Sequence, residues 1–474
     1  MRTVTACLLC GQGAFKPLVS IRGPVAHRSE GPREVTTFMV CRECGFVFQN
    51  PTLGSAELDE LYGRNYRTFD PPDDYQSDQK AYGEKLCDWV GSKLGAAGSG
   101  RTVLDIGCAA GFFLSAFRDR GWRAVGIDAN PRWVEWGRNR LGLDLRSGFF
   151  DDAAFPGEQF DLILFSHVLE HLPDPIPTLK AIRSKLKPGG FAFIGAPNVL
   201  LPPRNHLQAN FLARPHVCHY SSRTAHRILA KAGLAIADQD NWYPRGLRIL
   251  AGPMVEDFRP TEEHSDDWKA IQHLYAFLTG SGKATTFGRN LALMIPIHYE
   301  ALRLIAGKSL ATTSMWKGAT LEQVERMIEP GSASILRPNG GAASTMFESQ
   351  HWPGALEPGE VRIMIGLGAG RAAEALSAEL ERTDSRLVIC EPDPQLVRAL
   401  CAIRDLNAVL NSDRVRLVVG PNLVFRRFVR KWFSQATTVR TGVNPWLTPE
   451  LQRRYQPVEA LVSPHCHSQS VTVS

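Results

Sequence analysis

The chain has 474 residues, of which 44% are hydrophobic and 22% charged, and its formal net charge at pH 7 is +6. This length and composition predict a globular protein with more than one domain. The small net charge and the lack of a long Lys/Arg run give no indication of a nucleic-acid partner. No stretch is long and apolar enough to predict a membrane span. Because no apolar export signal is found at the N-terminus, we expect a cytoplasmic protein.

Two Cys-x-x-Cys pairs lie at the start of the chain, Cys7 with Cys10 and Cys41 with Cys44, separated by residues 11–40. Each pair can offer two thiolates to one ion, and four thiolates suit a tetrahedral structural zinc with no open coordination position. The long separation predicts an inserted hairpin. The alternative is four free buried cysteines without a metal.

After the cysteine pairs, the pattern predicts a strand over 46–50, helices over 55–62 and 76–94, and a Gly/Ala/Ser-rich linker over 95–100. An apolar strand over 103–106 follows, then a glycine turn and a helix. Such a turn at a helix N-terminus can hold a nucleotide-like ligand.

From this turn onward strands and helices alternate, which predicts an α/β fold with a doubly wound, Rossmann-like parallel sheet. The expected strands cover 122–127, 144–147, 160–165 and 191–196, and a further strand begins at 234. The expected helices cover 131–141, 175 to the Lys-Pro-Gly-Gly stop at 187–190, and 221 to Gly233.

Two carboxylates flank the glycine turn. Asp128 ends the second strand of this unit, where it can accept hydrogen bonds from a ribose diol. Asp105 precedes the turn, where it disfavours a pyrophosphate and suits a cationic, amino-bearing ligand. The pair therefore favours S-adenosylmethionine (SAM) over NAD or ATP.

With these residues in place, the chain resembles a class I SAM-dependent methyltransferase over about residues 101–238. The matching motifs are VLDIGCAAG (103–111), VGID (125–128), FDLILFSHVLEHLPDP (160–175) and LKPGGFAFIGAPN (186–198). The cysteine pairs upstream resemble a subgroup with an N-terminal zinc ribbon that includes sugar C-methyltransferases. The chain departs from the family pattern at Ala109, where the family has its middle glycine.

The resemblance implies a SAM-binding role for residues along the whole site. The methionine end would be lined by Asp105, Gly107, Ala109 and Gly111, the ribose would be bound by Asp128, the adenine by Phe150 with Asp151 or Asp152, and the sulfonium would face Ser166 and His167. The alternative is a dinucleotide-binding or degenerate Rossmann domain without catalysis.

Methyl transfer to a hydroxyl or a carbon acid also needs a proton acceptor. The candidates are His216, our first choice, and His167, Glu170, His171 and His219. The resemblance implies a catalytic histidine near His216, where sugar C-methyltransferases have a preceding glutamate, but here Pro215 takes that place. A structuring role for these residues, and a weak histidine zinc site of His206, His216 and His219, remain alternatives.

A second strand, glycine turn and distal acid appear near the C-terminus. The strand and turn cover 361–370, a helix covers 372–382, and a strand over 386–390 ends in Glu391; a third strand covers 415–420. This part resembles the start of a motility-accessory-factor or pterin-pyrophosphokinase-like domain. A structural, dimerisation or partner-docking role is the alternative to an activity of its own.

We therefore expect a zinc-ribbon module with its lead-in (1–75), a methyltransferase domain (76–250), a mostly helical connection (251–358) and a second, incomplete Rossmann-like domain (359–474). The expected function is methylation of a small molecule, such as a nucleotide sugar, glycan precursor or secondary metabolite. The alternatives are a non-catalytic SAM-binding or scaffold protein in surface-glycan or flagellin glycosylation, and a bifunctional enzyme with a C-terminal sugar-nucleotide activity. A homodimer or a glycan-assembly partner could use the C-terminal half.

Overall fold

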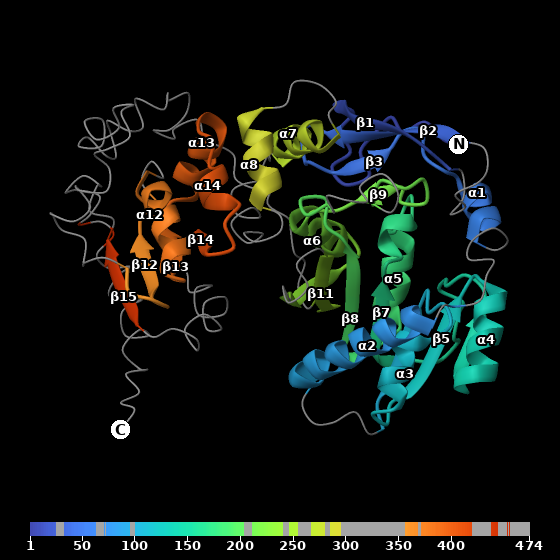
Figure 1. Ribbon diagram of the computed structural model, residues 1–474. Coiled ribbons are helices and arrows are strands. Elements are labelled where there is room, and N and C mark those ends of the chain that lie inside the picture. The colour runs from blue at the N-terminus through green and yellow to red at the C-terminus, as the bar shows by residue number, and fades with distance from the viewer. Residues whose placement is uncertain are drawn as a thin grey trace, which may run out of the picture. The chain divides into compact units, whose positions relative to one another are not determined.

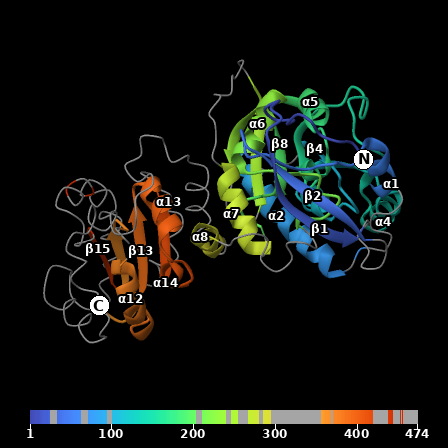
Figure 2. The same ribbon diagram turned by 90° about the horizontal axis from the view of Figure 1, so that it is seen from above.

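The computed structural model describes residues 1–24, 33–62, 71, 73–94, 100–202, 211–239, 246–254, 267–279, 285–294, 356–367, 371–419, 438–443, 453 and 455. The chain divides into two compact units, Met1–His264 and Ser265–Ser474, and each contains its own β-structure (Figures 1 and 2). His206 and residues 295–355 of the mostly helical connection expected from the sequence lie outside the described residues.

The first unit is built on a seven-stranded sheet with the order β10-β11-β8-β7-β4-β5-β6. Its strands are β4 (Thr102–Ile106), β5 (Arg123–Asp128), β6 (Asp144–Ser147), β7 (Phe160–Ser166), β8 (Leu186–Pro197), β10 (Leu234–Gln239) and β11 (Gly246–Pro253). β4 to β8 pair in parallel, whereas β11 runs antiparallel to both of its neighbours. The predicted Rossmann-like fold is confirmed, with a mixed sheet in place of a purely parallel one.

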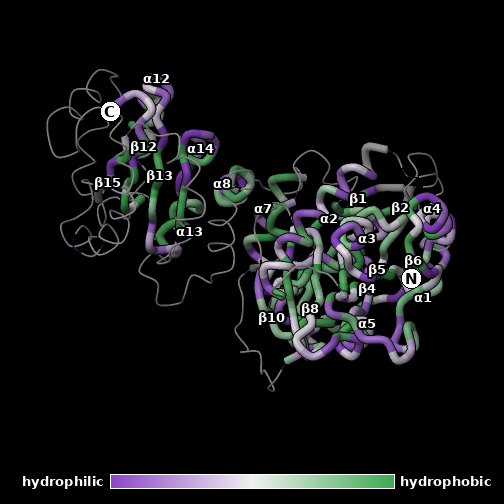
Figure 3. Tube along the Cα trace, turned by 90° about the horizontal axis from the view of Figure 1, so that it is seen from below, coloured by the Kyte–Doolittle hydropathy of each residue, from purple (hydrophilic) through white to green (hydrophobic). Residues whose placement is uncertain are grey.

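Helices cover both faces of this sheet because successive strand residues point to opposite sides. Leu104 and Ile163 pack in one core with α5 (Ile176–Ser184) and α6 (Ser222–Lys231). Their chain neighbours Val103 and Leu162 pack in another core, with α2 (Asp73–Leu94), α3 (Phe112–Arg118) and α4 (Pro131–Leu141). The strands are accordingly hydrophobic along most of their length (Figure 3).

The structure corrects two boundaries that the sequence predicted. α5 ends at Ser184, and the Lys187-Pro-Gly-Gly190 stretch lies inside β8. The backbone N–H of Phe160 already bonds to Lys185 O, so strand pairing begins before the Pro-Gly-Gly signal.

The sheet also extends past residue 238, where the resemblance in the sequence ended, since β11 is inserted between β8 and β10. The sequence hid this strand because the buried Arg248 interrupts its apolar run. In the fold the Arg248 guanidinium lies 4.6 Å from the centre of the Tyr82 ring, an arrangement in which a buried cation is stabilised by an aromatic face.

The N-terminal module is a second sheet with the order β1-β2-β3-β9. β1 (Phe15–Pro24) and β2 (Arg33–Cys41) form the antiparallel hairpin expected between the cysteine pairs, and β3 (Val47–Gln49) follows, before the short helix α1 (Ser55–Glu60). The fourth strand, β9 (Cys218–His219), comes from the far end of the methyltransferase segment and pairs with β3. The module and the larger sheet therefore share a core, which contains Phe46, Phe48 and Tyr220.

The second unit contains a four-stranded, all-parallel sheet with the order β14-β13-β12-β15. Its elements are α7 (Asp267–Thr279), α8 (Thr286–Met294), β12 (Val361–Ile365), α12 (Arg371–Arg382), β13 (Arg386–Glu391), α13 (Pro394–Ile403), α14 (Asn407–Leu410), β14 (Val415–Val419) and β15 (Val439–Val443). The predicted second Rossmann-like unit is confirmed, and β15 is a strand that the sequence pattern did not indicate.

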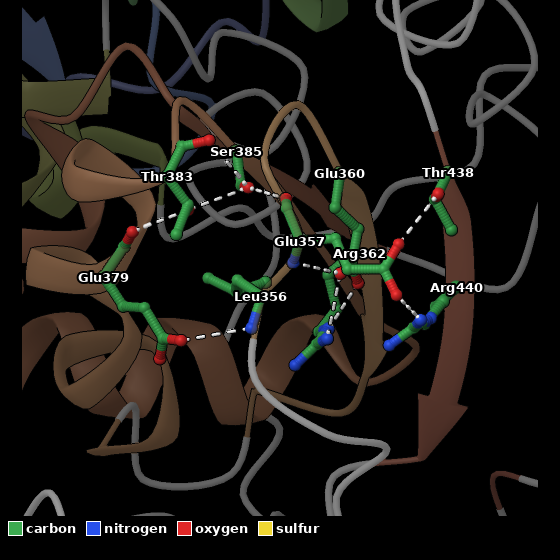
Figure 4. A network of polar contacts seen from close by, with 9 residues as sticks. All are labelled: Leu356, Glu357, Glu360, Arg362, Glu379, Thr383, Ser385, Thr438 and Arg440. Atoms are coloured by element: carbon green, nitrogen blue, oxygen red, sulfur yellow. Dashed lines mark hydrogen bonds and ion pairs between the residues drawn. The ribbon is translucent and has the colours of Figure 1, made fainter.

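A polar network holds the edge of this second sheet (Figure 4). The buried Arg362 donates to the equally buried Glu360, with Nε 2.8 Å from Oε1. Glu357 accepts hydrogen bonds from Thr438 and Arg440, and so connects β15 to the turn before β12. Among the described residues, no helix is long and apolar enough to cross a bilayer.

Candidate active site

A cavity of about 870 Å³ lies where β4, β5 and β7 end. In a parallel sheet the carboxyl ends of the strands meet at one edge, and ligands bind in the crevice outside them. Both motifs that the sequence singled out at this edge, the turn after β4 and the Ser166-His167 tip of β7, line the cavity.

The turn after β4 requires glycine at two positions. Gly107 has φ of 77° and Gly111 has φ of 82°, in the left-handed region. A Cβ at Gly107 would lie 2.5 Å from Val168 Cγ2, and one at Gly111 would lie 2.5 Å from a methyl carbon of Leu143. Gly107 lines the cavity, whereas Gly111 lies outside its lining. Gly111 thus packs the turn against the protein behind it.

Asp128 fixes this turn from the neighbouring strand. Its Oδ2 accepts a hydrogen bond from Ala109 N at 2.8 Å, and its Oδ1 accepts one from Asn130 N at 2.8 Å. The carboxylate lies in the cavity wall. A carboxylate oxygen can accept more than one hydrogen bond, so Asp128 can still bind hydroxyls of a ligand.

Asp105 is buried, with 3% of its surface exposed, and also lines the cavity. Burial, and then the charge of Asp128, raise the pKa of Asp105 well above its usual value. Two nearby carboxyls in a buried wall are stabilised by a bound cation. The site therefore fits SAM, whose amino group and sulfonium are positive.

The far side of the cavity is formed by Gly148, Phe149 and Phe150 after β6. Phe149 is 53% exposed, which is unusual for a large apolar side chain and suits stacking on a flat ring. Asp151 and Asp152 lie outside the lining: Asp151 accepts from Ala154 N, and Asp152 accepts from Ser184 Oγ. Phe150 lines the cavity as the sequence suggested. Phe149 also lines it, but no sequence motif pointed to Phe149.

A further part of the wall comes from the segment around α1, which the sequence did not connect with the site. Leu53, Leu58 and Tyr62 line the cavity there, as do Leu172 and Thr178 from the segment after β7. This wall is largely apolar, as expected for a small-molecule pocket with few polar groups.

His167 and Glu170 form a pair beside the cavity. His167 has φ of 56° and its side chain is 60% exposed, and it lines the cavity. Its Nδ1 lies 3.1 Å from Oε1 of Glu170, which is 1% exposed. Burial alone would raise the pKa of Glu170, but the His167 hydrogen bond and the nearby histidines lower it to about 2.

The other three candidate bases lie together behind this pair. His171 lines the cavity, whereas Glu170, His216 and His219 lie outside its lining. Burial lowers the pKa of His171 and of His219 to about 3 and lowers that of His216. Histidines with such depressed pKa values are neutral and weakly basic at physiological pH.

The four N-terminal cysteines meet as the sequence predicted. All four Sγ atoms lie within 4.8 Å of one another, and Cys7–Cys44 and Cys10–Cys41 are each 3.6 Å apart. Zinc–sulfur bonds of about 2.3 Å in a tetrahedron separate sulfurs by about 3.8 Å. The thiol hydrogen bonds with Cys44 and Cys7 lower the pKa of Cys41, while the contacts with Cys41 and Cys7 raise the pKa of Cys44. The arrangement thus fits a zinc ion.

Comparisons with known proteins indicate which family the chain is similar to. A family model described as "Methyltransferase domain" matches residues 75–239. The ubiquinone biosynthesis O-methyltransferase of Stutzerimonas stutzeri (strain A1501) is 33% identical over 176 residues, which are 32% of this chain and 70% of that protein. That of Aeromonas salmonicida (strain A449) is 26% identical over 196 residues, 36% of this chain and 82% of that protein. A SAM-dependent methyltransferase structure from Mesorhizobium loti has 18% identity and a TM-score of 0.30, over 35% of this chain and 97% of that one.

Proposed function

Because this chain belongs to the class I SAM-dependent methyltransferases, we propose that it methylates a hydroxyl group of a small molecule, with His167 as the base. The single observation that carries the proposal is the cavity. It joins the glycine turn and Asp128, which suit SAM, to His167 and to an apolar wall that suits an acceptor.

The residues that hold SAM follow from its chemistry. Asp105 attracts its amino group, and Asp128, already fixed by Ala109 N, accepts hydrogen bonds from the ribose. Phe149 and Phe150 cover the adenine. SAM, when bound, supplies an activated methyl group together with its leaving group. The protein then has to align the acceptor and remove its proton.

His167 is the candidate base that combines access with orientation. It lines the cavity, and its Nδ1 donates to the buried Glu170, so Nε2 carries the lone pair that can take a proton. Glu170 acts as a positioning residue, because its carboxylate fixes the tautomer and the ring of His167. His216, the first candidate base from the sequence, is less suited to this role than His167 because it lies outside the cavity lining.

The acceptor is proposed to be a hydroxylated small molecule, such as a nucleotide sugar, a glycan precursor or a secondary metabolite. Relatives named as O-methyltransferases favour an oxygen nucleophile, and a histidine base is compatible with a hydroxyl acceptor. The acceptor would enter between Leu58 and Tyr62 on one side and Leu172 on the other.

The test begins with calorimetry of the full chain with SAM, followed by incubation with radiolabelled SAM and a small-molecule extract. We expect SAM to bind in the micromolar range and the labelled methyl group to appear in a small molecule. The labelling should stop when the hydroxyl group of that molecule is chemically blocked. His167→Ala should bind SAM within a few-fold of wild type and lose about 100-fold in kcat/KM, partly restored by added imidazole. His226→Ala, at a histidine of α6 outside the cavity lining, is the matched control.

The outcomes separate the parts of the proposal. Failure to bind SAM would refute the methyltransferase activity of this site. SAM binding without any labelled product would favour the scaffold alternative. Full activity of His167→Ala would remove His167 as the base and return the role to the other candidates.

We also propose that Cys7, Cys10, Cys41 and Cys44 bind a structural zinc, supported by the geometry of their four sulfurs. All four coordination positions are then filled by protein, so this ion stabilises the fold and takes no part in the chemistry. Cys41→Ser should lose the ion and lower the melting temperature, as metal analysis and thermal unfolding would show. Cys87→Ser, at a buried cysteine outside the cluster, should retain the ion.

A further inference from the structure

A second group of metal-ligating side chains lies in the first unit, separate from the cysteines. Glu170, His171 and His216 each place one ligand atom so that all three lie within 4.8 Å of one another. Glu170 and His171 belong to the short 3-10 helix Leu169–His171 after β7, and His216 precedes β9. The sequence suggested a histidine site of a different composition, with His206 and His219 in place of Glu170 and His171.

The two histidines are oriented as metal ligands usually are. His171 Nδ1 lies 3.0 Å from Pro215 O, and His216 Nδ1 lies 2.9 Å from Phe211 O. The Tyr62 hydroxyl also lies 2.5 Å from His171 Nδ1, and it donates to Pro215 O, so its oxygen can accept from the same N–H. Because a carbonyl oxygen only accepts hydrogen bonds, we assign the hydrogen of each ring to Nδ1 and a lone pair to each Nε2. Metal-bound histidines characteristically donate their second ring N–H to a backbone carbonyl in this way.

Glu170 supplies an independent observation that points to a ligand. Its side chain is 1% exposed and Oε1 is taken by His167. Its Oε2 is buried and has no hydrogen-bond partner among the described residues. A buried carboxylate oxygen without a partner costs stability unless a cation or a donor meets it, and no lysine or arginine of the described residues forms an ion pair with Glu170.

His219 lies next to this group but is not one of its ligands. Both of its ring nitrogens are buried without a hydrogen-bond partner, but its ring is stacked on Phe211 and lies 6.1 Å from the His216 ring. We therefore treat His219 as a packed neighbour and use it to test the ligand set.

We infer that Glu170, His171 and His216 form a second metal site, for a divalent first-row transition ion of which zinc is our choice. Two imidazoles and one carboxylate are a ligand set used by zinc at sites that keep an open position. This inference goes beyond the proposed function and does not need it. Only one consequence rests on that function: because Glu170 also holds His167, the ion would help to fix the orientation of the proposed base.

The experiment is metal analysis of the full chain after loading with zinc and removal of the excess. We expect about two zinc equivalents in wild type and about one in Cys41→Ser, His171→Asn and His216→Asn, because each change removes one ligand of one site. The double variant Cys41→Ser/His216→Asn should retain almost none. His226→Asn and His219→Phe should keep both ions.

Cobalt as the probe distinguishes the two sites in the same samples. The sulfur site gives a thiolate-to-cobalt charge-transfer band, and the histidine site gives only the weaker ligand-field bands of nitrogen and oxygen ligands. Cys41→Ser should lose the first and His216→Asn the second. Calorimetry with SAM on each sample reports separately whether the methyltransferase site is intact, so a failure of the metal site and a failure of the proposed function are distinguishable.

The inference is overturned if wild type binds only the thiolate-type ion, or if His216→Asn retains both ions. Loss of the second ion in His219→Phe would overturn the assigned ligand set. If His216→Asn fails to fold, Cys41→Ser decides the matter: the ion that it retains must show the nitrogen and oxygen spectrum, and its absence refutes the site.

Discussion

The two glycine turns of this chain have the same construction. In the first unit Asp128 accepts from Ala109 N in the turn and from Asn130 N two residues after itself. In the second unit Glu391 likewise accepts from Leu367 N in the turn and from Asp393 N two residues after itself. In both, an acid at the end of one strand holds the turn that follows its neighbour.

The turns differ in whether the carboxylate that holds them is accessible to a ligand. Asp128 lies in the wall of an open cavity, whereas Glu391 is 1% exposed and accepts a further hydrogen bond from the Tyr455 hydroxyl at 2.7 Å. Asp105 precedes the first turn, while the second is preceded by the apolar Met364 and Ile365. A shared scaffold therefore indicates a ligand site only where the chain leaves its acid accessible.

The largest expected effect is on SAM affinity. Asp128→Ala removes both the support of Ala109 N and the acceptor for the ribose, and hydrogen bonds to a charged group contribute about 1.5–3 kcal/mol each. We expect SAM binding to weaken by at least about 100-fold, while Glu391→Ala leaves it unchanged. Calorimetry measures both, and equal affinities for wild type and Asp128→Ala would contradict the ribose role.

The next effect is the pH dependence of the second unit. Burial raises the pKa of Glu391 from 4.5 to about 7, against the lowering effects of its hydrogen bonds from Asp393 N and the Tyr455 hydroxyl. The fold therefore favours the protonated form. Protonation of Glu391 therefore contributes to the free energy of unfolding. The contribution is fully present below pH 4.5 and is lost as the pH rises through about 7, and its size is on the order of 3 kcal/mol at most.

Urea unfolding of wild type and Glu391→Gln across this pH range would measure it. The glutamine variant cannot ionise, so this loss of stability should be missing from the unfolding of the second unit. The first unit serves as an internal control: the raised pKa of Asp105 is unaffected by Glu391→Gln, so the pH dependence of the first unit should be the same in both proteins. An identical pH profile for the two proteins would show that Glu391 ionises normally.

A smaller effect is expected from adding a methyl group to the turns. Gly107→Ala forces a non-glycine residue to φ of 77° with Cβ 2.5 Å from Val168 Cγ2, which should cost about 1–3 kcal/mol. Gly366→Ala, at φ of 94°, should also destabilise. Gly91→Ala is the control: its Cβ meets nothing within 4 Å in α2, so it should stabilise by roughly 0.5–1 kcal/mol. Denaturant unfolding gives all three values, and a neutral Gly107→Ala would argue against a constrained turn.

The smallest effect is expected from Tyr455→Phe, which removes only the hydroxyl that meets Glu391. The loss should be about 1 kcal/mol of unfolding free energy, with no change in SAM affinity. If the variant instead acquires affinity for adenosine in calorimetry, the second turn is a ligand site that Tyr455 covers, and the contrast between the turns would narrow.

Local signals in the sequence predicted the elements around the first turn closely. α4 and β6 have the predicted bounds, because Asn130 caps the helix by accepting from Arg132 N and Trp133 N, Pro131 begins it and Gly142 ends it in the left-handed region. Non-local pairing was not predictable. β9 is only two residues long and has no period to recognise, and its partner β3 lies far away in the sequence.

The residues of the site also divide into those that local motifs predict and those that depend on non-local pairing. Asp105, Gly107, Asp128, Ser166 and His167, which the motif singled out, all line one cavity, and their roles in SAM binding stay predictions. The approach of His216 to Glu170 and His171 depends on the connection between β9 and β3, where Gln49 Nε2 donates to Arg214 O and His216 O. No spacing rule in the sequence expresses such a contact, and an exposed aromatic such as Phe149 has no motif of its own.

The pairing of β9 with β3 also sets an order for biosynthesis. The cysteines are made early, but the last strand of their sheet appears only when Cys218 and His219 have been synthesised. Until then the edge of β3 is open and could pair with another nascent chain. A fragment that ends before residue 218 would thus expose this edge, so a soluble version of the N-terminal module should be sought in fragments that include β9.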